Sequence, residues 1–124
     1  MKYKHLLFID DDEISNYLSK RMIQNIDSAL KVKVITSGEE AINFLKDFSN
    51  IDLIFLDINM PGMDGIDFIK EYRKLDYTAK VIILTSIELS TDKLNQLIEL
   101  NCCDLILKPI NKEKLEPFMA SKLT

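Results

Sequence analysis

The sequence predicts an α/β fold in which a doubly wound, five-stranded parallel sheet is covered by five helices. The first observation is that five short apolar runs alternate with longer stretches of helical periodicity, a pattern typical of parallel sheets with helical crossovers. The second is that three of these runs are continuously apolar, as strands buried on both faces are. The third is that the run after residue 30 alternates lysine with valine, which favours an edge position for that strand.

The apolar runs give the expected strands and their order in the sheet. The strands are Leu6 to Ile9, Val32 to Ile35, Leu53 to Leu56, Val81 to Leu84 and Leu105 to Leu107. Right-handed crossovers leave few topologies for such a chain. With the second strand at one edge and the short fifth strand at the other, the order is 2-1-3-4-5, which is the flavodoxin-like arrangement.

The stretches between the strands predict five helices from apolar residues spaced three or four apart. The expected apolar stripes, helix by helix, are Ile14, Leu18 and Met22; residues of Glu39 to Phe48; Ile66, Ile69 and Tyr72; Leu94, Leu97 and Ile98; and Leu115, Phe118 and Met119. The first helix is expected over Glu13 to Asn25 and the fourth over Thr91 to Leu100. Ser37 and Glu40 form a capping-box pattern before the second, and Asn101 is suited to ending the fourth.

Length and composition exclude several classes of protein. The chain has 124 residues, 47% of them hydrophobic and 29% charged, so we expect a single domain over residues 1–124 with a sizeable core. A net charge of −4 without a basic cluster argues against direct nucleic-acid binding. No apolar run approaches the roughly 18 residues that span a bilayer, and the start of the chain is unlike a secretory signal, so the expected location is the cytoplasm. The adjacent Cys102 and Cys103 are expected to be reduced thiols.

Polar residues gather where the predicted strands end. Strand one is followed by Asp10-Asp11-Asp12-Glu13, strand three by Asp57, strand four by Thr85-Ser86 and strand five by Lys108-Pro109. Because ligands of doubly wound sheets bind at the carboxyl ends of the strands, where the winding reverses, these side chains are expected to share one site. Taken singly, Asp12 could be a helix cap, Thr85 a turn residue and Lys108 a solvated charge.

The combination of residue types indicates the chemistry of this site. Carboxylates brought together repel one another unless a cation lies among them, and Mg²⁺ is the cation that prefers oxygen ligands of this kind. A carboxylate beside such an ion can attack phosphorus and form an acyl phosphate. The transfer depends mostly on positioning and charge neutralisation, for which a divalent ion, a lysine and a hydroxyl suffice.

With these residues in place, the chain resembles the receiver domain of two-component response regulators over nearly its whole length. The segments FIDDDE, FLDINMPGMDG, ILTS and LILKP occur in the order and spacing of that family, and LDINMPGMDG is similar to its central signature. Within this signature, Met60-Pro61-Gly62-Met63 is suited to a type II turn.

The resemblance implies a role for each site residue. Asp57 resembles the phosphoacceptor, and Asp10 and Asp11 resemble the acidic pair that holds Mg²⁺, Asp11 directly and Asp10 mainly through water. Asn59 would offer its backbone carbonyl to the ion. Lys108 resembles the lysine that pairs with the phosphoryl group, and it precedes a proline, Pro109, that is usually cis. Thr85 resembles the hydroxyl residue that moves toward the phosphate.

Three positions depart from the family pattern or modify it. Leu105 stands where the family usually has an aromatic ring that rotates inward with the threonine, so a coupled threonine–aromatic switch is not expected. Pro117 falls inside the last expected helix, which predicts a kink or a separate first turn. Ile87, two residues beyond Thr85, cannot orient a water by hydrogen bonding, which predicts a long-lived phosphorylated state.

Three other protein classes fit parts of the pattern. A flavodoxin-like mononucleotide binder would need glycines or hydroxyls after strand one, where DDDE would repel a phosphate. A haloacid-dehalogenase-type phosphatase could use Asp10, Asp12, Thr36 and Lys108, but it needs an acidic pair after the lysine, and only Glu113 and Glu116 follow. A pseudo-receiver that only binds partners would be expected to lack an acid or the lysine, and none is missing.

The sequence therefore predicts a phosphorylation-dependent signalling switch and no turnover enzyme acting on a separate substrate. The expected donor is a sensor histidine kinase or a phosphotransfer protein, and the site is expected to hydrolyse its own phosphate as an autophosphatase. The phosphorylated state is expected to pass through helix 4, strand 5 and helix 5 to an unknown protein target, with a homodimer as one possibility. No output domain follows Thr124 in this sequence, so either a stand-alone receiver or a part of a longer regulator is expected.

Overall fold

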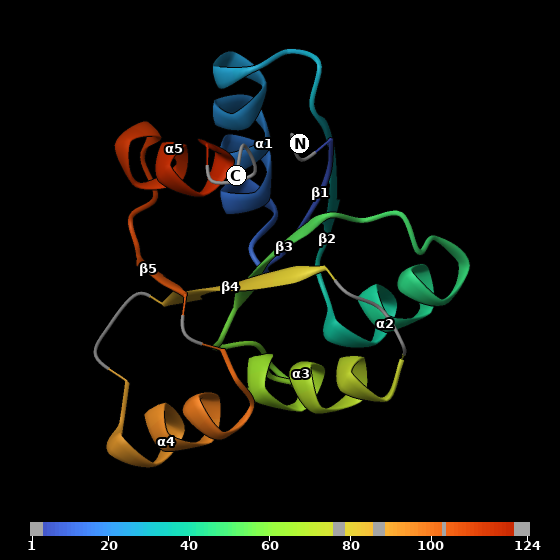
Figure 1. Ribbon diagram of the computed structural model, residues 1–124, viewed down its shortest axis with the longest axis vertical. Helices are drawn as coiled ribbons and strands as arrows, with labels where there is room; N and C mark the ends of the chain where they lie inside the picture. Colours follow the sequence, from blue (N-terminus) through green and yellow to red (C-terminus); the bar gives the residue numbers. More distant parts are fainter. Residues whose placement is uncertain (1–3, 76–78, 86–88, 103, 121–124) are drawn as a thin grey trace.

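A computed structural model describes residues 4–75, 79–85, 89–102 and 104–120. Strands and helices alternate along the chain as predicted (Figure 1). The strands are β1 (His5–Ile9), β2 (Lys31–Ile35), β3 (Leu53–Asp57), β4 (Lys80–Thr85) and β5 (Leu105–Leu107). The helices are α1 (Glu13–Ile26), α2 (Gly38–Asp47), α3 (Gly65–Lys74), α4 (Thr91–Glu99) and α5 (Lys112–Ala120).

The five strands form one parallel sheet in the order β2-β1-β3-β4-β5, which confirms the predicted flavodoxin-like arrangement. The lysines of β2 are exposed while Val32 and Ile35 are buried, as expected of an edge strand. All five residues of β3 are buried, as expected at the centre of a sheet. The winding reverses between β1 and β3, so the carboxyl ends of these two strands lie side by side.

Helices cover both faces of the sheet (Figure 1). On one face α2, α3 and α4 pack over a core that includes Leu7, Ile54 and Leu56. On the other, α1 and α5 pack over a core that includes Phe8 and Phe55, whose rings stack with centroids 4.4 Å apart. Alternate residues of each central strand therefore serve opposite cores, which explains why the predicted strands read as unbroken apolar runs.

The apolar stripe expected on α1 is only partly confirmed: Met22 packs against the core, but the fully buried residues of this helix lie at other positions. Ile14 is 70% exposed and Leu18 is 56% exposed, whereas Asn16, Ser19 and Ile23 are buried. The polar Asn16 can lie on the buried face of the helix because its amide donates hydrogen bonds to backbone carbonyls at the ends of β1 and β2. Apolar spacing alone could not show this, since the exposed residues have the same period.

Helix α4 is also less buried than its sequence predicts. Of the expected stripe only Leu97 is buried, while Leu94 is 44% exposed and Ile98 is 60% exposed. Within α4, Leu97 is the residue that joins the core shared with α2 and α3. By contrast, the stripe expected on α3, namely Ile66, Ile69 and Tyr72, is fully confirmed.

Local signals at turns and helix ends are mostly confirmed. Ser37 caps α2 by accepting a hydrogen bond from the Glu40 N–H, and Asn101 ends α4 with a φ of 61°. Gly62 has a φ of 72°, as the third residue of a type II turn requires. Pro117 lies within α5, which is continuous from Lys112 to Ala120, so the separate first turn considered for this helix is not present.

Candidate functional site

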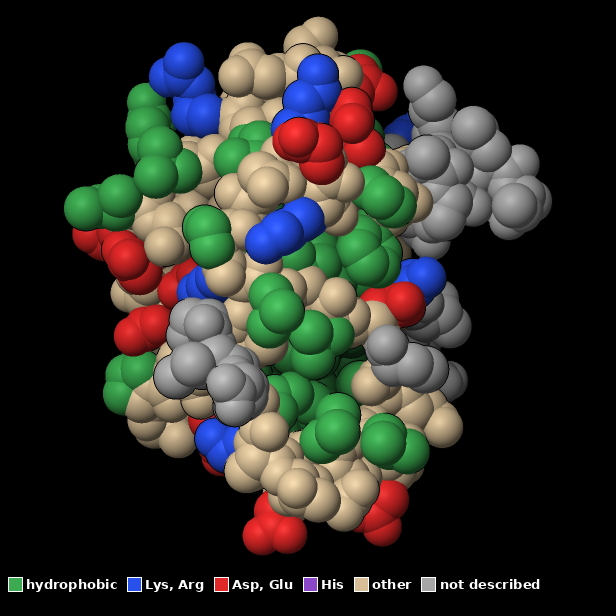
Figure 2. All heavy atoms as spheres, turned by 90° about the vertical axis from the view of Figure 1, so that its left-hand side faces the viewer, with side chains coloured by type: hydrophobic (Ala, Val, Ile, Leu, Met, Phe, Trp, Pro, Cys, Tyr) green, Lys and Arg blue, Asp and Glu red, His purple; other side chains and the backbone are tan. Residues whose placement is uncertain are grey.

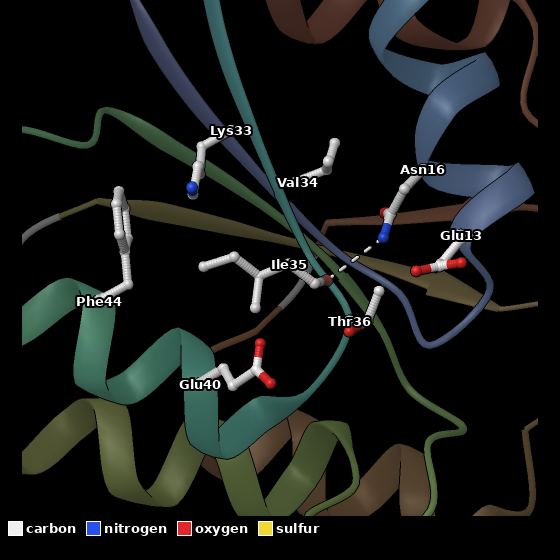
Figure 3. Close-up of a pocket in the computed structure, with 8 residues that line it drawn as sticks. All are labelled: Glu13, Asn16, Lys33, Val34, Ile35, Thr36, Glu40 and Phe44. Carbon is white, nitrogen blue, oxygen red and sulfur yellow. Dashed lines mark hydrogen bonds between the residues drawn. The ribbon is translucent and has the colours of Figure 1, made fainter.

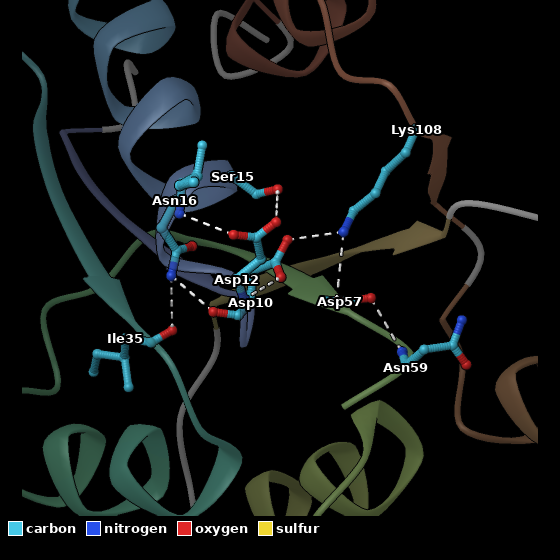
Figure 4. A network of polar contacts seen from close by, with 9 residues as sticks. Asp10, Asp12, Ser15, Asn16, Ile35, Asp57, Asn59 and Lys108 are labelled. Atoms are coloured by element: carbon cyan, nitrogen blue, oxygen red, sulfur yellow. Dashed lines mark hydrogen bonds and ion pairs between the residues drawn. The ribbon is translucent and has the colours of Figure 1, made fainter. Parts of the chain in front are cut away.

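The carboxyl ends of β1, β3 and β5 bring three of the expected site residues into contact (Figure 4). The Lys108 ammonium donates to Asp10 Oδ2 at 2.8 Å and lies 3.5 Å from Asp57 Oδ2. Both carboxylates are almost fully buried, with Asp10 2% and Asp57 5% exposed. Two buried acids and one partly buried lysine therefore form a connected charged group between the strands that flank the winding reversal.

Lys108, which follows β5, pairs with both carboxylates of this group. Burial tends to lower the pKa of its ammonium, but the hydrogen bond to Asp10 and the charges of Asp10 and Asp57 outweigh that effect, so the pKa lies above its ordinary value. The Lys108 backbone N–H donates to the Thr85 carbonyl at 2.7 Å, and the following Lys108–Pro109 peptide is cis, as predicted. The side chain therefore stays charged and is directed at the two carboxylates.

Asp57 is the carboxylate with the most strongly shifted pKa in the described part of the chain. Burial is the largest cause and raises its pKa, the Asn59 N–H bound to Oδ1 at 3.1 Å opposes this, and the Asp10 charge adds to it. The net effect raises the pKa of Asp57 to about 6. Burial is therefore the main reason that ionised Asp57 is disfavoured, and the neighbouring Asp10 charge adds the repulsion that the sequence predicts.

Asp10 is fixed by contacts that sequence analysis partly missed. Its Oδ1 accepts the Asp12 N–H at 3.0 Å, and its backbone carbonyl accepts the buried Asn16 amide at 2.8 Å. The same amide reaches the Ile35 carbonyl at 3.3 Å, so Asn16 joins the ends of β1 and β2 behind the acids. The sequence did contain one indication of this role: Asn16 lies inside a predicted helix, where an asparagine is favourable only if its side chain has a specific partner.

Asp11 completes an acidic cluster at the surface. Unlike Asp10 and Asp57 it is exposed, and each of the three offers a carboxylate oxygen within 4.8 Å of the others. Oxygen donors from two adjacent residues and a neighbouring strand suit a hard divalent cation that keeps part of its water shell. Of the remaining acids of the DDDE segment, Asp12 caps α1 by accepting the Ile14 N–H, a contact that also lowers its pKa.

Thr85 ends β4 beside this cluster and is 1% exposed. The adjoining positions 86–88 lie outside the described residues, so the expectation for Ile87 is not tested here. Leu105, which stands where the family usually has an aromatic residue, opens β5 opposite Ile83 and is 38% exposed.

A second lysine that sequence analysis did not single out lies at the edge of the site. Lys93, in the first turn of α4, reaches Asn59 Oδ1 with its ammonium at 3.5 Å. Asn59 in turn holds Asp57 through its backbone N–H. The sequence carried no motif at Lys93, because its contact depends on how α4 is placed against the β3 end.

A separate hollow of about 430 Å³ lies between α1, β2 and α2 (Figure 3). Its lining includes Glu13, Thr36 and Glu40 but neither Asp10, Asp57 nor Lys108. In the phosphatase alternative, Thr36 would act together with Asp10, Asp12 and Lys108. Thr36 lines this hollow, and Asp12 caps α1 by accepting the Ile14 N–H.

Comparisons with known proteins agree with this fold. Residues 6–119 match the response regulator receiver domain family. The probable transcriptional regulator ycf27 of Cyanidium caldarium is 36% identical over 120 residues, which are 96% of this chain and 46% of that protein. A two-component response regulator from Legionella pneumophila superposes with a TM-score of 0.80 at 31% identity, covering 92% of this chain and 93% of that one.

A second similar structure is more distant in sequence and shows the fold. It is the receiver domain of the Arabidopsis thaliana histidine kinase CKI1, solved with Mg²⁺ and BeF3⁻, with a TM-score of 0.78, 19% identity and coverage of 92% of this chain and 88% of that one.

The chain belongs to the response regulator receiver domain family, a signalling module of two-component systems. It spans about half the length of curated relatives such as ycf27. Within the part of the chain that the structure describes, no helix is both long and apolar enough to cross a membrane.

Proposed function

We propose that this chain is a phosphorylation-dependent switch in which Asp57 accepts a phosphoryl group and Asp10, Asp11 and Lys108 assist the transfer. The observation that carries the proposal is the contact of Lys108 with both Asp10 and Asp57 at the end of the central strand. Family membership supports it, since residues 6–119 match the receiver family and these acids and the lysine lie in the segments that resemble its motifs.

The transfer requires an unprotonated Asp57 oxygen that faces the incoming phosphorus. Oδ2 faces Lys108, while Oδ1 is held by the Asn59 N–H, so the carboxylate cannot rotate freely. One Asp57 oxygen attacks phosphorus, the bond from phosphorus to the donor's nitrogen or oxygen breaks, and the donor leaves with that electron pair. Lys108 then offsets negative charge on the phosphoryl oxygens.

Mg²⁺ fits the donor set of this site. Asp10, Asp11 and Asp57 provide oxygens within 4.8 Å of one another, and the Asn59 carbonyl is proposed to add a fourth ligand. When bound, the ion supplies positive charge that lowers the cost of bringing a phosphate to three carboxylates. The CKI1 receiver, which has the same fold, was solved with this ion.

Loss of the phosphoryl group is proposed to occur at the same site. Water attacks phosphorus, the bond between phosphorus and the Asp57 oxygen breaks, and inorganic phosphate leaves as the carboxylate is restored. The residues that hold the phosphoryl group therefore also set its lifetime. The chain is thus a switch with autophosphatase activity, and it has no separate substrate to turn over.

The surface of α4, β5 and α5 is proposed to transmit the phosphorylated state (Figure 2). Four exposed apolar side chains of α4 and β5 gather on it: Leu94, Ile98, Leu105 and Leu107. Figure 2 shows apolar side chains running down this face between charged ones. Because Leu105 cannot rotate as a ring would, we propose that movement of Thr85 repacks α4 against β5.

The partners follow from the proposed chemistry. A sensor histidine kinase or a phosphotransfer protein would supply the phosphoryl group, and a downstream protein, or a second copy of the chain, would bind the apolar face of α4 and β5. We propose that residues 1–124 form one receiver domain that works in the cytoplasm without binding nucleic acid or membrane directly.

Intact mass after incubation with acetyl phosphate tests this function. We expect one phosphoryl group to be added to the wild-type chain when Mg²⁺ is present and none when the ion is chelated. The matched variants are Asp57→Asn, which should stay unlabelled, and Asp47→Asn, an exposed acid at the end of α2 that should label normally. Labelling of Asp57→Asn at the wild-type level would contradict the proposal.

A further inference from the structure

The first turn of α4 places a cation beside the loop that holds Asp57. The Lys93 ammonium contacts Asn59 Oδ1 at 3.5 Å, and the Asn59 backbone binds Asp57 Oδ1 at 3.1 Å. Lys93 is half-buried, whereas lysines are usually well exposed. Figure 4 shows Asn59 extending from the end of β3 on the side of Asp57 away from α1. Lys93 therefore adds positive charge on the α4 side of the site.

This position is electrostatically unfavourable for the helix itself. Ser90 caps α4 by accepting the Lys93 N–H, so Lys93 is the third residue of the helix, near its positive end. A cation in the first turn of a helix is unfavourable, whereas an anion there is stabilising. A negatively charged group arriving near Lys93 would relieve that cost and interact with the helix end as well.

The charges of the proposed site show where such an anion would come from. The three clustered carboxylates are balanced by Lys108 together with a divalent ion. Replacing the Asp57 carboxylate with a phosphoryl group adds one negative charge that these cations do not balance. Lys93 supplies one further positive charge at the same edge.

We propose that Lys93 binds the phosphoryl group on Asp57 as a second cation and thereby draws the first turn of α4 toward the site. This inference rests on the proposed function of Asp57. On phosphorylation the ammonium exchanges its long contact with the neutral Asn59 oxygen for a charge-assisted hydrogen bond to a phosphoryl oxygen. No covalent bond of Lys93 forms or breaks in this exchange.

The packing of α4 allows this movement to be transmitted. Leu97 is the one residue of α4 that is buried, and Leu94 and Ile98 lie on the surface. Attraction of Lys93 to the phosphoryl group therefore has to overcome the packing of few buried side chains to move the helix. The exposed Leu94, which is next to Lys93, moves with it. Lys93 thus provides a link from the phosphoryl group to the apolar face of α4 and β5 that needs no aromatic residue at position 105.

The test measures binding of BeF3⁻ in the presence of Mg²⁺ by titration calorimetry, together with amide exchange of residues 91–99. Lys93→Gln should weaken BeF3⁻ binding three- to tenfold and abolish the change in exchange that BeF3⁻ causes in α4. Lys93→Arg should retain both the BeF3⁻ affinity and the change in amide exchange of α4, because the guanidinium keeps the charge and the hydrogen-bond donors. Lys70→Gln removes an exposed lysine from α3 and should behave as wild type.

Wild-type affinity in Lys93→Gln, or an unchanged α4 response despite weaker binding, would overturn the proposal. Failure of the proposed function itself is recognised separately, because the wild-type chain would then bind no BeF3⁻ and Asp57→Asn would not differ from it. Raised salt should reduce the difference between wild type and Lys93→Gln, since the ammonium lies near the surface.

Discussion

Replacing Asp57 by asparagine should stabilise the metal-free protein at neutral pH. The carboxylate is 5% exposed, and Lys108 at 3.5 Å is shared with Asp10 at 2.8 Å, so Asp57 is incompletely neutralised. Asparagine has the same shape, and its oxygen can still accept the Asn59 N–H. The substitution therefore removes a destabilising charge while most of the local hydrogen bonding remains.

The size of this effect follows from the pKa of Asp57, which is raised from 3.8 to about 6. A difference of that size corresponds to about 3 kcal/mol of destabilisation at pH well above 6. This shift already includes the attraction of Lys108, but the asparagine turns an NH₂ group toward that ammonium in place of an oxygen, which offsets part of the gain. We therefore expect the free energy of unfolding of Asp57→Asn to exceed that of wild type by about 1–3 kcal/mol at pH 7.5.

The sign of the pH dependence is fixed by the direction of the shift. Between pH 3.8 and about 6, the folded protein retains the Asp57 proton while the unfolded chain loses it, so wild-type stability falls as pH rises. The variant lacks this group. The difference in unfolding free energy should thus be close to zero near pH 3.8, grow through pH 6 and stay constant above it.

Urea unfolding of both proteins at a series of pH values, with the metal chelated, measures this difference. Asp47→Asn serves as the control, because its exposed carboxylate should change stability by less than about 0.5 kcal/mol at every pH. Added Mg²⁺ should stabilise wild type more than Asp57→Asn and reduce the gap. A variant that is less stable than wild type at pH 7.5, or a gap that does not change across pH 6, would refute the reasoning.

Three further predictions follow from the same site. Asp11→Ala should raise the melting temperature of the metal-free protein and weaken Mg²⁺ binding, which thermal melts with and without the ion would show; undiminished stabilisation by Mg²⁺ would exclude Asp11 as a ligand. Asn16→Ala should lower the free energy of unfolding by about 1–3 kcal/mol in denaturant titrations, because the Asp10 carbonyl loses its buried donor, whereas Asn25→Ala on the exposed side of α1 should have little effect. Thr85→Ala should abolish the BeF3⁻-induced change in amide exchange in the described residues between 89 and 108, whereas Leu105→Tyr should preserve it; an unchanged response in Thr85→Ala would contradict the proposed relay.

The strands were predictable from short-range sequence patterns, and the contacts at their ends were predictable from the topology of the sheet. Each strand was placed within two residues of its observed bounds, since buried strands are continuous apolar runs bounded by polar residues. The contact of Lys108 with Asp10 and Asp57 follows from topology, which brings the carboxyl ends of parallel strands to one edge.

The helix faces and two of the site's contacts were not predictable in the same way. On α1 the buried face is set by hydrogen bonds of Asn16, and these can outweigh the apolar period of Ile14 and Leu18. The contact of Lys93 with Asn59 depends on where α4 lies against the β3 end, which no local motif encodes. Such contacts require tertiary placement to be known first.

The central claim is that Asp57 is the residue that carries the phosphoryl group, and locating that group tests it most directly. After incubation with acetyl phosphate and Mg²⁺, borohydride reduces an acyl phosphate to an alcohol, and peptide mass spectrometry then identifies the altered residue. We predict homoserine at position 57 and unmodified aspartate at positions 10 and 11. Modification at Asp10 with Asp57 unchanged would contradict the account.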